Sequence, residues 1–420
     1  MENVSMSRLP RPSRSGSRRG LHTVALVATL VIGMVIGANS PFAGADTNID
    51  DTEAWVTFQE VWDTLWNQYV EPDTLDAEVL MYGAISGMVE AVGDTGHTSF
   101  TDPAEAALQD TSLRGEYVGI GISIDSTGAR PVIVDVFEGS PAEQAGIEIG
   151  DVIREVNGID VYGMRSEEVG SAFLTADGEP VHLVLQRGDD LFDLELYREA
   201  IDIDEVKWWM IGDNIAQISY SSFVTGSADE LAIAVDEAID AGAELFILDL
   251  RANGGGLVTE MLDVVGIFAP AGTPVQKIQY RNGSTEMLTV RNGNHFGFPL
   301  VILTSRSTAS AAEVTTASLN EAGVATVIGE VTAGTGTGLD SVGFEDGSQL
   351  RYATVLWMTP SGESIWKVGY QPDFEIELDS GIDRVQPEDG GSMTLAEVEE
   401  TRDTQLQAAI AFLLGETFGD

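Results

Sequence analysis

Apolar residues at the start of the predicted folded region recur every three or four positions. One such series runs from Trp55 to Tyr69 and a second from Leu75 to Val92, with a break at residues 71–73. This spacing places the apolar side chains on one face of an α-helix, so it predicts an amphipathic helical hairpin. Residues 93–100 are rich in turn formers, and we expect a structured loop there.

The pattern changes after about residue 114. Short runs of β-branched residues, separated by Gly, Asp and Asn, predict strands at 118–124, 132–137, 152–156 and 181–186. Further along, strand-like runs at 215–220, 244–250, 300–304 and 326–328 alternate with helical patterns at 227–241, 258–268 and 309–321. Strands separated by crossover helices predict an α/β layer with a largely parallel sheet and a site at the carboxyl ends of its strands. A last strand-like run covers 350–358.

These changes divide the chain into parts, and the predicted fold class is α/β and multidomain. We expect an export signal or N-terminal membrane anchor at 1–45, a helical region at 52–113, a β-rich domain at 114–199, an α/β core at 200–378, a linker at 379–393 and a closing amphipathic helix at 394–420.

The N-terminal segment has the order of features that export requires. Five arginines precede an apolar run from about Thr23 to Ala38, which ends in the small residues 43–45. The run is near the short limit for a spanning helix, so cleavage after Ala45 and retention as an anchor both stay open. Membrane contact is expected only through this segment, and the rest of the chain is predicted to be periplasmic, at the cell surface or secreted.

Charge and composition narrow the function classes. The 21 basic and 68 acidic residues give a net charge of −47, which excludes nucleic acid as a partner. Solubility and adaptation to high salt both account for such a surface. The chain has no cysteine, so cysteine nucleophiles, disulfides and thiolate metal sites are excluded.

Three segments of the β-rich region match a known sequence pattern. Segments 117–122, 139–146 and 150–158 resemble the carboxylate-binding loop, short helix and following turn of a PDZ domain. The resemblance implies that protein or peptide C-terminal tails are bound by Tyr117, Val118, Gly119, Ile120 and Gly121. Glycines let backbone N–H groups approach a carboxylate, and a strand edge can pair with the peptide. A β-rich spacer without a ligand is the alternative.

Two strand-to-helix junctions carry the candidate chemistry. The first ends in the glycines 254–256, and the second places Ser310 at the start of a helix. A serine there benefits from free N–H groups and the positive end of the helix dipole, which stabilise an oxyanion. Taken singly, the glycines indicate a plain turn and the serine a helix N-cap.

Together the junctions closely resemble the core of the C-terminal processing (tail-specific) proteases, peptidase family S41. The match continues at 215–223, 329–332, 346–348, 359–362 and 369–373, so it covers nearly all of the predicted exported chain. The resemblance implies that Ser310 is the nucleophile and that the amides of Gly255 and Ala311 form the oxyanion hole. No metal and no organic cofactor is implied.

The sequence departs from the family at the general base. Thr335 stands at the position of the usual lysine, and threonine cannot serve as a desolvated amine base. His97 is one replacement, because its Gly-His-Thr setting resembles the base-bearing loop of the tricorn-like proteases and an imidazole suits proton transfer near neutral pH. Glu363 is the candidate to orient it. Another base such as Lys367, or no base at all, are the alternatives.

The function expected from these features is that of an exported serine endopeptidase which holds a C-terminal tail and cleaves with Ser310. The alternative is an inactive pseudo-peptidase that binds tails as a scaffold or sensor, favoured by the loss of the lysine. A general extracellular peptide-binding protein with a purely structural core is a third interpretation. The oligomeric state is not set by any of these features.

Overall fold

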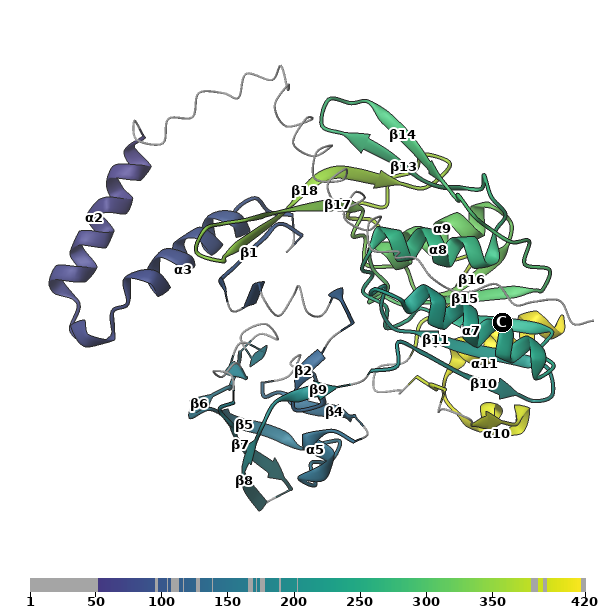
Figure 1. The fold of residues 1–420 in the computed structure, drawn as a ribbon, viewed down its shortest axis with the longest axis horizontal. Helices are drawn as coiled ribbons and strands as arrows, with labels where there is room; N and C mark the ends of the chain where they lie inside the picture. The colour runs from purple at the N-terminus through teal and green to yellow at the C-terminus, as the bar shows by residue number, and fades with distance from the viewer. Residues whose placement is uncertain are drawn as a thin grey trace, which may run out of the picture. The chain divides into compact units, whose positions relative to one another are not determined.

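The computed structural model describes residues 52–416, with gaps at 95–96, 104, 107–112, 116, 126–128, 138, 165–168, 171, 174–177, 189, 202, 379–383 and 388–390 (Figure 1). The segment predicted as an export signal or anchor lies outside the described residues. Within the described part, no helix is both long and apolar enough to cross a membrane. The chain divides into two compact units, residues 1–77 and 78–420.

The N-terminal region is helical, as predicted. In the first unit, α2 (Glu53–Gln68) is followed by the short 3₁₀ helix η2 (Pro72–Thr74), and α3 (Ala77–Glu90) opens the second unit. The hydroxyl of Thr52 caps α2 by accepting a hydrogen bond from the Trp55 amide at 3.2 Å. The chain therefore breaks at the proline-containing segment whose composition had predicted a turn.

The β-rich region is a small sheet domain. Its strands are β2 (Tyr117–Gly119), β3 (Ile122–Asp125), β4 (Val132–Val136), β5 (Val152–Val156), β6 (Ile159–Asp160), β7 (Val181–Arg187), β8 (Asp190–Leu196) and β9 (Glu199–Ile201), with the short helix α5 (Pro141–Gln144) after β4. The main sheet has the order β3-β4-β5-β7-β8, and β2 pairs with β9. Strand β3 is therefore an edge strand. Alternate residues of β7 are fully buried, which gives the domain a core of its own.

The predicted strand over 118–124 is interrupted in the structure. The chain bends at Ile120 and Gly121, and Gly121 has a φ of +83°. A Cβ atom at Gly121 would lie 2.2 Å from the Cβ of Ser140, the residue that caps α5. Only glycine permits this approach, so the loop before β3 and the start of α5 are packed directly together.

The α/β core is built on a seven-stranded sheet with the order β19-β16-β15-β12-β11-β10-β20 (Figure 1). Its strands are β10 (Val206–Ile211), β11 (Ile215–Tyr220), β12 (Leu245–Asp249), β15 (Leu300–Thr304), β16 (Ala325–Gly329), β19 (Phe374–Glu375) and β20 (Ser392–Met393). Strands β11, β12, β15 and β16 are parallel to one another, whereas β10 is antiparallel to β11.

Both faces of this sheet are covered by helices. Phe246 and Leu248 pack on the side of α7 (Ser227–Asp240), α8 (Val258–Phe268) and α9 (Ala311–Glu321), and Ile247 packs with the C-terminal helices. The strands are consequently continuous apolar runs, as expected for a parallel sheet buried on both sides.

A second, antiparallel sheet stands beside the core and was predicted only in part. Its strands are β1 (Ser99–Thr101), β13 (Pro274–Tyr280), β14 (Thr285–Thr289), β17 (Thr337–Gly343) and β18 (Gln349–Met358), and the order is β1-β18-β13-β14 with β17 also on β18. Of these strands, only β18 had a clear sequence signal.

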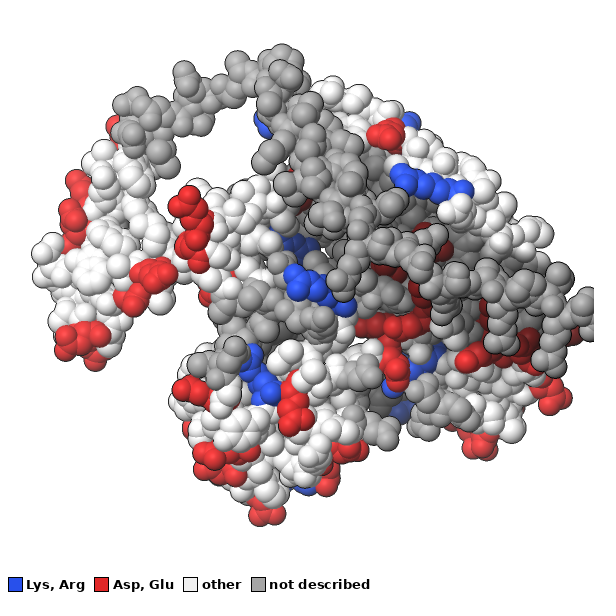
Figure 2. Space-filling view, viewed as in Figure 1, with Lys and Arg blue, Asp and Glu red and all other residues white. Residues whose placement is uncertain are grey.

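The C-terminal part differs from the prediction of one helix after a linker. It forms α10 (Leu395–Glu400) and α11 (Thr404–Leu414), because Asp403 caps a new helix by accepting from the Leu406 amide at 3.0 Å. The last two residues of the predicted linker form β20, which pairs with β10. Acidic side chains are scattered over the face shown in Figure 2 and do not gather into one patch.

Candidate active site

Ser310 lies at the junction between β15 and α9 in an unusual backbone conformation. Its φ is 55° and its ψ is −118°, a region that residues other than glycine rarely adopt. Such backbone strain is concentrated at functional sites. The turn places Ser310 at the mouth of α9, where the first helical residue, Ala311, has an N–H group without an acceptor inside the helix.

The glycine loop meets Ser310 at very close range. A Cβ atom built on Gly255 would lie 2.6 Å from the Cβ of Ser310, 2.8 Å from the Ala309 oxygen and 2.9 Å from the Ala311 nitrogen. Gly255 also has a φ of +98°, so both space and conformation require glycine here. The structure thus brings together Ser310, the predicted nucleophile, and the two residues predicted to supply oxyanion donors.

The Gly255 amide differs from its predicted role. Its N–H donates to Oδ1 of Asn253 at 2.8 Å, and Asn253 Nδ2 donates in turn to the Tyr220 carbonyl at 2.8 Å. This donor therefore already has an acceptor within the chain, and Asn253 has to release it before the Gly255 amide can bind another oxygen.

The buried carboxylate of Glu313 connects several segments of the site by hydrogen bonds. Glu313 was not among the predicted site residues. Glu313, with 0% exposure, accepts hydrogen bonds at Oε1 from the Gly334 amide at 2.8 Å and from the Thr332 hydroxyl. At Oε2 it accepts from the Ser310 amide at 2.9 Å, the Thr335 amide at 2.8 Å and the Thr335 hydroxyl at 2.5 Å. The spacing Ser-x-x-Glu at a helix start was the signal that could have found it.

Thr335, which was predicted to replace a lysine base, lies directly beside Ser310. Its hydroxyl accepts a hydrogen bond from the Ser310 amide and donates one to Glu313. A small neutral side chain therefore lies next to Ser310 and supports its backbone.

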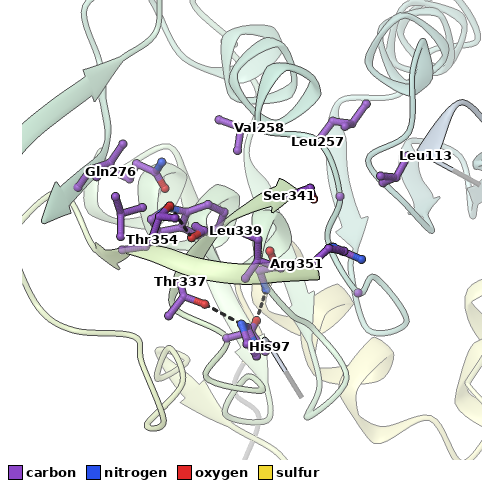
Figure 3. A pocket seen from close by; sticks show the side chains of 18 of the residues that line it. His97, Leu113, Leu257, Val258, Gln276, Thr337, Leu339, Ser341, Arg351 and Thr354 are labelled. Carbon is purple, nitrogen blue, oxygen red and sulfur yellow. Dashed lines mark hydrogen bonds between the residues drawn. The ribbon is translucent and has the colours of Figure 1, made fainter. Parts of the chain in front are cut away.

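His97 is held by a loop that is anchored on the antiparallel sheet. Asp94 accepts from the Thr98 amide at 3.0 Å, and the next residues form β1, which pairs with β18. The imidazole Nδ1 is 2.7 Å from the Thr337 hydroxyl, as Figure 3 shows, and Trp366 meets the ring edge-on with 5.1 Å between ring centroids. The ring is thus fixed on two sides.

The surroundings of His97 favour the neutral form of its imidazole. Partial burial lowers its pKa below the usual value of 6.5, since the charged form is the more costly to desolvate. Asp94 and Glu313 act in the opposite direction, and Arg351 adds to the lowering. A neutral imidazole is the form that can accept a proton.

Ser310, His97 and Thr335 line one pocket of about 550 Å³. Thr335 contacts Ser310, and Thr337 contacts His97. Both threonines line this pocket with the two candidate catalytic residues. Among the described residues no hydrogen bond joins them directly.

The other two candidates are placed elsewhere. Glu363 is exposed and is not among the residues that line the pocket; in place of its predicted orienting role, the Thr337 hydroxyl meets His97 Nδ1. Lys367 donates from Nζ to the Gly93 carbonyl at 3.1 Å and lies over Trp366. It contacts the loop that carries His97, and Ser310 is not its partner.

Comparison with known proteins decides the family. A sequence model of peptidase family S41 matches residues 214–376, and one of a PDZ domain matches residues 132–187. The chain is 31% identical over 356 residues to the carboxy-terminal processing protease CtpA of Bacillus subtilis (strain 168), covering 84% of this chain and 76% of the relative. The chain belongs to peptidase family S41.

Further relatives of this S41 family member agree. A probable CtpA-like serine protease of Staphylococcus aureus (strain COL) is 30% identical over 358 residues, covering 84% of this chain and 71% of the relative. The solved structure of a photosystem II D1 C-terminal processing protease matches with a TM-score of 0.52 and 27% identity, over 77% of this chain and 87% of that one. The S41 and PDZ predictions are confirmed.

The glycine loop of this S41 family member rests on a buried ion cluster. The side chain of Arg251, 0% exposed, pairs with Asp249 at 2.6 Å and with Asp403, the cap of α11, at 2.8 Å. Burial alone would raise the pKa of Asp249, but Arg251 outweighs it and holds this pKa below its usual range. The last helix of the chain thus supports the loop next to Ser310.

The predicted peptide-binding residues fall in β2 and in the bend before β3. Tyr117 is turned toward Glu205, donating its hydroxyl to Oε1 at 2.7 Å, and burial together with this carboxylate raises its pKa. The remaining positions, Val118 to Gly121, lead into β3, which lies at the edge of its sheet among the described strands. An edge strand is the element to which a peptide can add as a further strand.

Proposed function

We propose that this S41 family member is an exported serine endopeptidase that holds protein C-terminal tails in its PDZ domain and cleaves peptide bonds with Ser310, using His97 as the general base. The observation that carries the proposal is the placement of Ser310 in strained backbone at the mouth of α9, against Gly255, in a pocket that His97 also lines. Export is supported by the basic, apolar and small-residue order of residues 1–45.

The proton path follows from the contacts of the imidazole. Because Nδ1 faces the Thr337 hydroxyl, Nε2 is the nitrogen that takes the proton of Ser310, and Nδ1–H donates to Thr337. The step requires Nε2 to reach the serine hydroxyl, and both residues line the same pocket. The hydroxyl oxygen then attacks the peptide carbonyl carbon, and the protonated imidazole gives its proton to the departing amine.

The negative charge that forms on the carbonyl oxygen is stabilised by the Ala311 amide and the positive end of α9. The Gly255 amide joins when Asn253 releases it. Water, activated by His97, then hydrolyses the acyl-enzyme and restores the serine. Each step uses groups of this chain, the peptide and water.

A fluorophosphonate probe, which reacts with activated serines, tests the proposal. We expect labelling of the wild type, none in Ser310→Ala, and a rate lower by about 100- to 10,000-fold in His97→Ala. His182→Ala is the matched control, because His182 lies in β7 with its side chain 52% exposed. Unchanged labelling in His97→Ala removes His97 as the base.

The second candidate function is a pseudo-peptidase that binds tails without cleaving them. It is favoured by Thr335 at the lysine position and by the hydrogen bond that holds the Gly255 amide on Asn253. It predicts that the folded wild type binds a peptide with a free carboxylate, and does not bind the amidated peptide, while Ser310 resists the probe. Labelling of Ser310 at a measurable rate excludes it.

A further inference from the structure

Gln276 is a buried polar residue that the proposed chemistry does not use. It lies in β13 with 1% of its surface exposed, and among the described residues neither its Oε1 nor its Nε2 has a hydrogen-bond partner. Leaving a buried polar group unpaired costs about 1–3 kcal/mol. Native proteins pair nearly all such groups, so a partner is expected to arrive from outside the described chain.

The position of Gln276 relates it to Ser310. Strand β13 packs along α9, where Ser318 Oγ donates to the Pro274 carbonyl at 3.0 Å. Gln276 and Ile278 are two residues apart, which places them on one face of the strand, and both line the pocket that contains Ser310. Ile278 pairs in turn with Trp357 of β18, another pocket residue.

Apolar side chains form much of the wall around this part of the pocket. Val258, Ile278, Leu339, Val355 and Trp357 contribute to the lining. Among the described lining residues, Arg351 is the one permanently charged group, and it is six residues from Trp357 along β18, or about 20 Å. Figure 3 shows the Gln276 amide on the Thr354 side of the pocket, away from His97.

A largely apolar wall with one buried, unpaired amide selects a particular kind of side chain. A primary amide needs both an acceptor for its N–H groups and a donor for its oxygen. A carboxylate only accepts, an ammonium only donates, and both lose hydration against apolar walls. The amide of glutamine or asparagine satisfies both needs and stays neutral, and its methylene stem fits the apolar walls.

We propose that Gln276 determines specificity by pairing with the amide side chain of a substrate glutamine or asparagine next to the scissile bond. This inference rests on the proposed peptidase function, because it assigns a substrate preference to the same pocket. Gln276 is a binding residue here and takes no part in bond cleavage.

Peptide substrates that differ only in glutamine against methionine test this preference, since the two side chains have similar length. Each flanking position of the scissile bond is varied in turn, and kcat/KM is measured for the wild type, Gln276→Leu and Gln279→Leu. We expect the wild type and Gln279→Leu to favour the amide by about 10- to 100-fold at one position, and Gln276→Leu to lose that preference. Gln279 is the matched control, because it lies in β13 one residue past Ile278.

A binding measurement separates this proposal from the peptidase proposal. In the Ser310→Ala background, fluorescence anisotropy compares the glutamine and methionine peptides without cleavage. Tighter binding of the glutamine peptide, lost in Ser310→Ala with Gln276→Leu, supports the specificity role even when the wild type hydrolyses nothing. Equal affinities and equal kcat/KM values for the two peptides overturn it, and would mean that an ordered water satisfies the amide.

Discussion

Replacing Glu313 by glutamine tests whether the strained backbone of Ser310 depends on one buried carboxylate. The two carboxylate oxygens accept five hydrogen bonds, two at Oε1 and three at Oε2. Glutamine has one oxygen, and its NH2 group cannot accept. Even when that oxygen takes the place of Oε2, the Gly334 N–H is left facing another donor, while the Thr332 hydroxyl can turn to accept.

The magnitude follows from this count. An unpaired buried group costs about 1–3 kcal/mol, and hydrogen bonds to a charged acceptor are worth about 1.5–3 kcal/mol each. We therefore expect Glu313→Gln to lower the free energy of unfolding of the core by about 2–4 kcal/mol. The Ser310 amide would then donate to a neutral oxygen in place of a charged one, and this weaker hold on its backbone should also slow the reaction of Ser310 with a fluorophosphonate.

Urea unfolding followed by tryptophan fluorescence measures the first quantity, since the chain has 7 tryptophans, and the labelling rate measures the second. Glu375→Gln is the matched control, because Glu375 is exposed in β19. If Glu313→Gln stays within about 0.5 kcal/mol of the wild type and labels at the same rate, Glu313 does not hold the site together.

Three further predictions address the base, the glycine loop and the ion cluster. Burial lowers the pKa of His97, so its neutral form persists below pH 6.5. The labelling rate should therefore fall only as the pH drops through a midpoint under 6.5. A midpoint above 6.5, or the same pH profile in His97→Ala, contradicts this prediction. Gly255→Ala should abolish labelling, because the Cβ of the new alanine would lie 2.6 Å from the Cβ of Ser310. Labelling at the wild-type rate would show that the glycine loop does not contact the site. Asp403→Asn should lower the free energy of unfolding by about 3–5 kcal/mol, because it leaves the buried Arg251 with one ionic partner fewer. Thermal unfolding compares this variant with Asp240→Asn, a control at an exposed position. Equal Tm values for the two variants would refute the prediction.

The sequence predicted the elements of the α/β core well, because its parallel strands are covered on both faces. The bounds of β11, α8 and β15 coincide with the predicted ones, because continuous apolar runs and three-to-four spacing have few alternative interpretations. Strands β14 and β17 were missed, since most of their residues are exposed and β17 contains two glycines, which leaves no alternating pattern to detect.

Only part of the candidate site could be predicted from the sequence. Ser310 and Gly255 follow predicted strands, and a serine at a helix start next to a glycine loop is a local signal. Thr337 and Gln276 carry no local signal, because each becomes part of the pocket only through strand pairing with β18, in a sheet that the sequence pattern did not reveal. Glu363, which lies in a turn, was predicted to orient His97. Its side chain is exposed, because the position of a residue in a turn does not determine the direction of its side chain.

The salt link between Arg251 and Asp403 joins two parts of the chain that are far apart in the sequence. Asp403 caps α11 and also pairs with the guanidinium beneath the glycine loop, so separation of α11 from the core leaves Arg251 with Asp249 as its ionic partner. Loosening of this helix therefore loosens the loop next to Ser310. Under the proposed function, a change at α11 would alter proteolysis without any contact with the pocket.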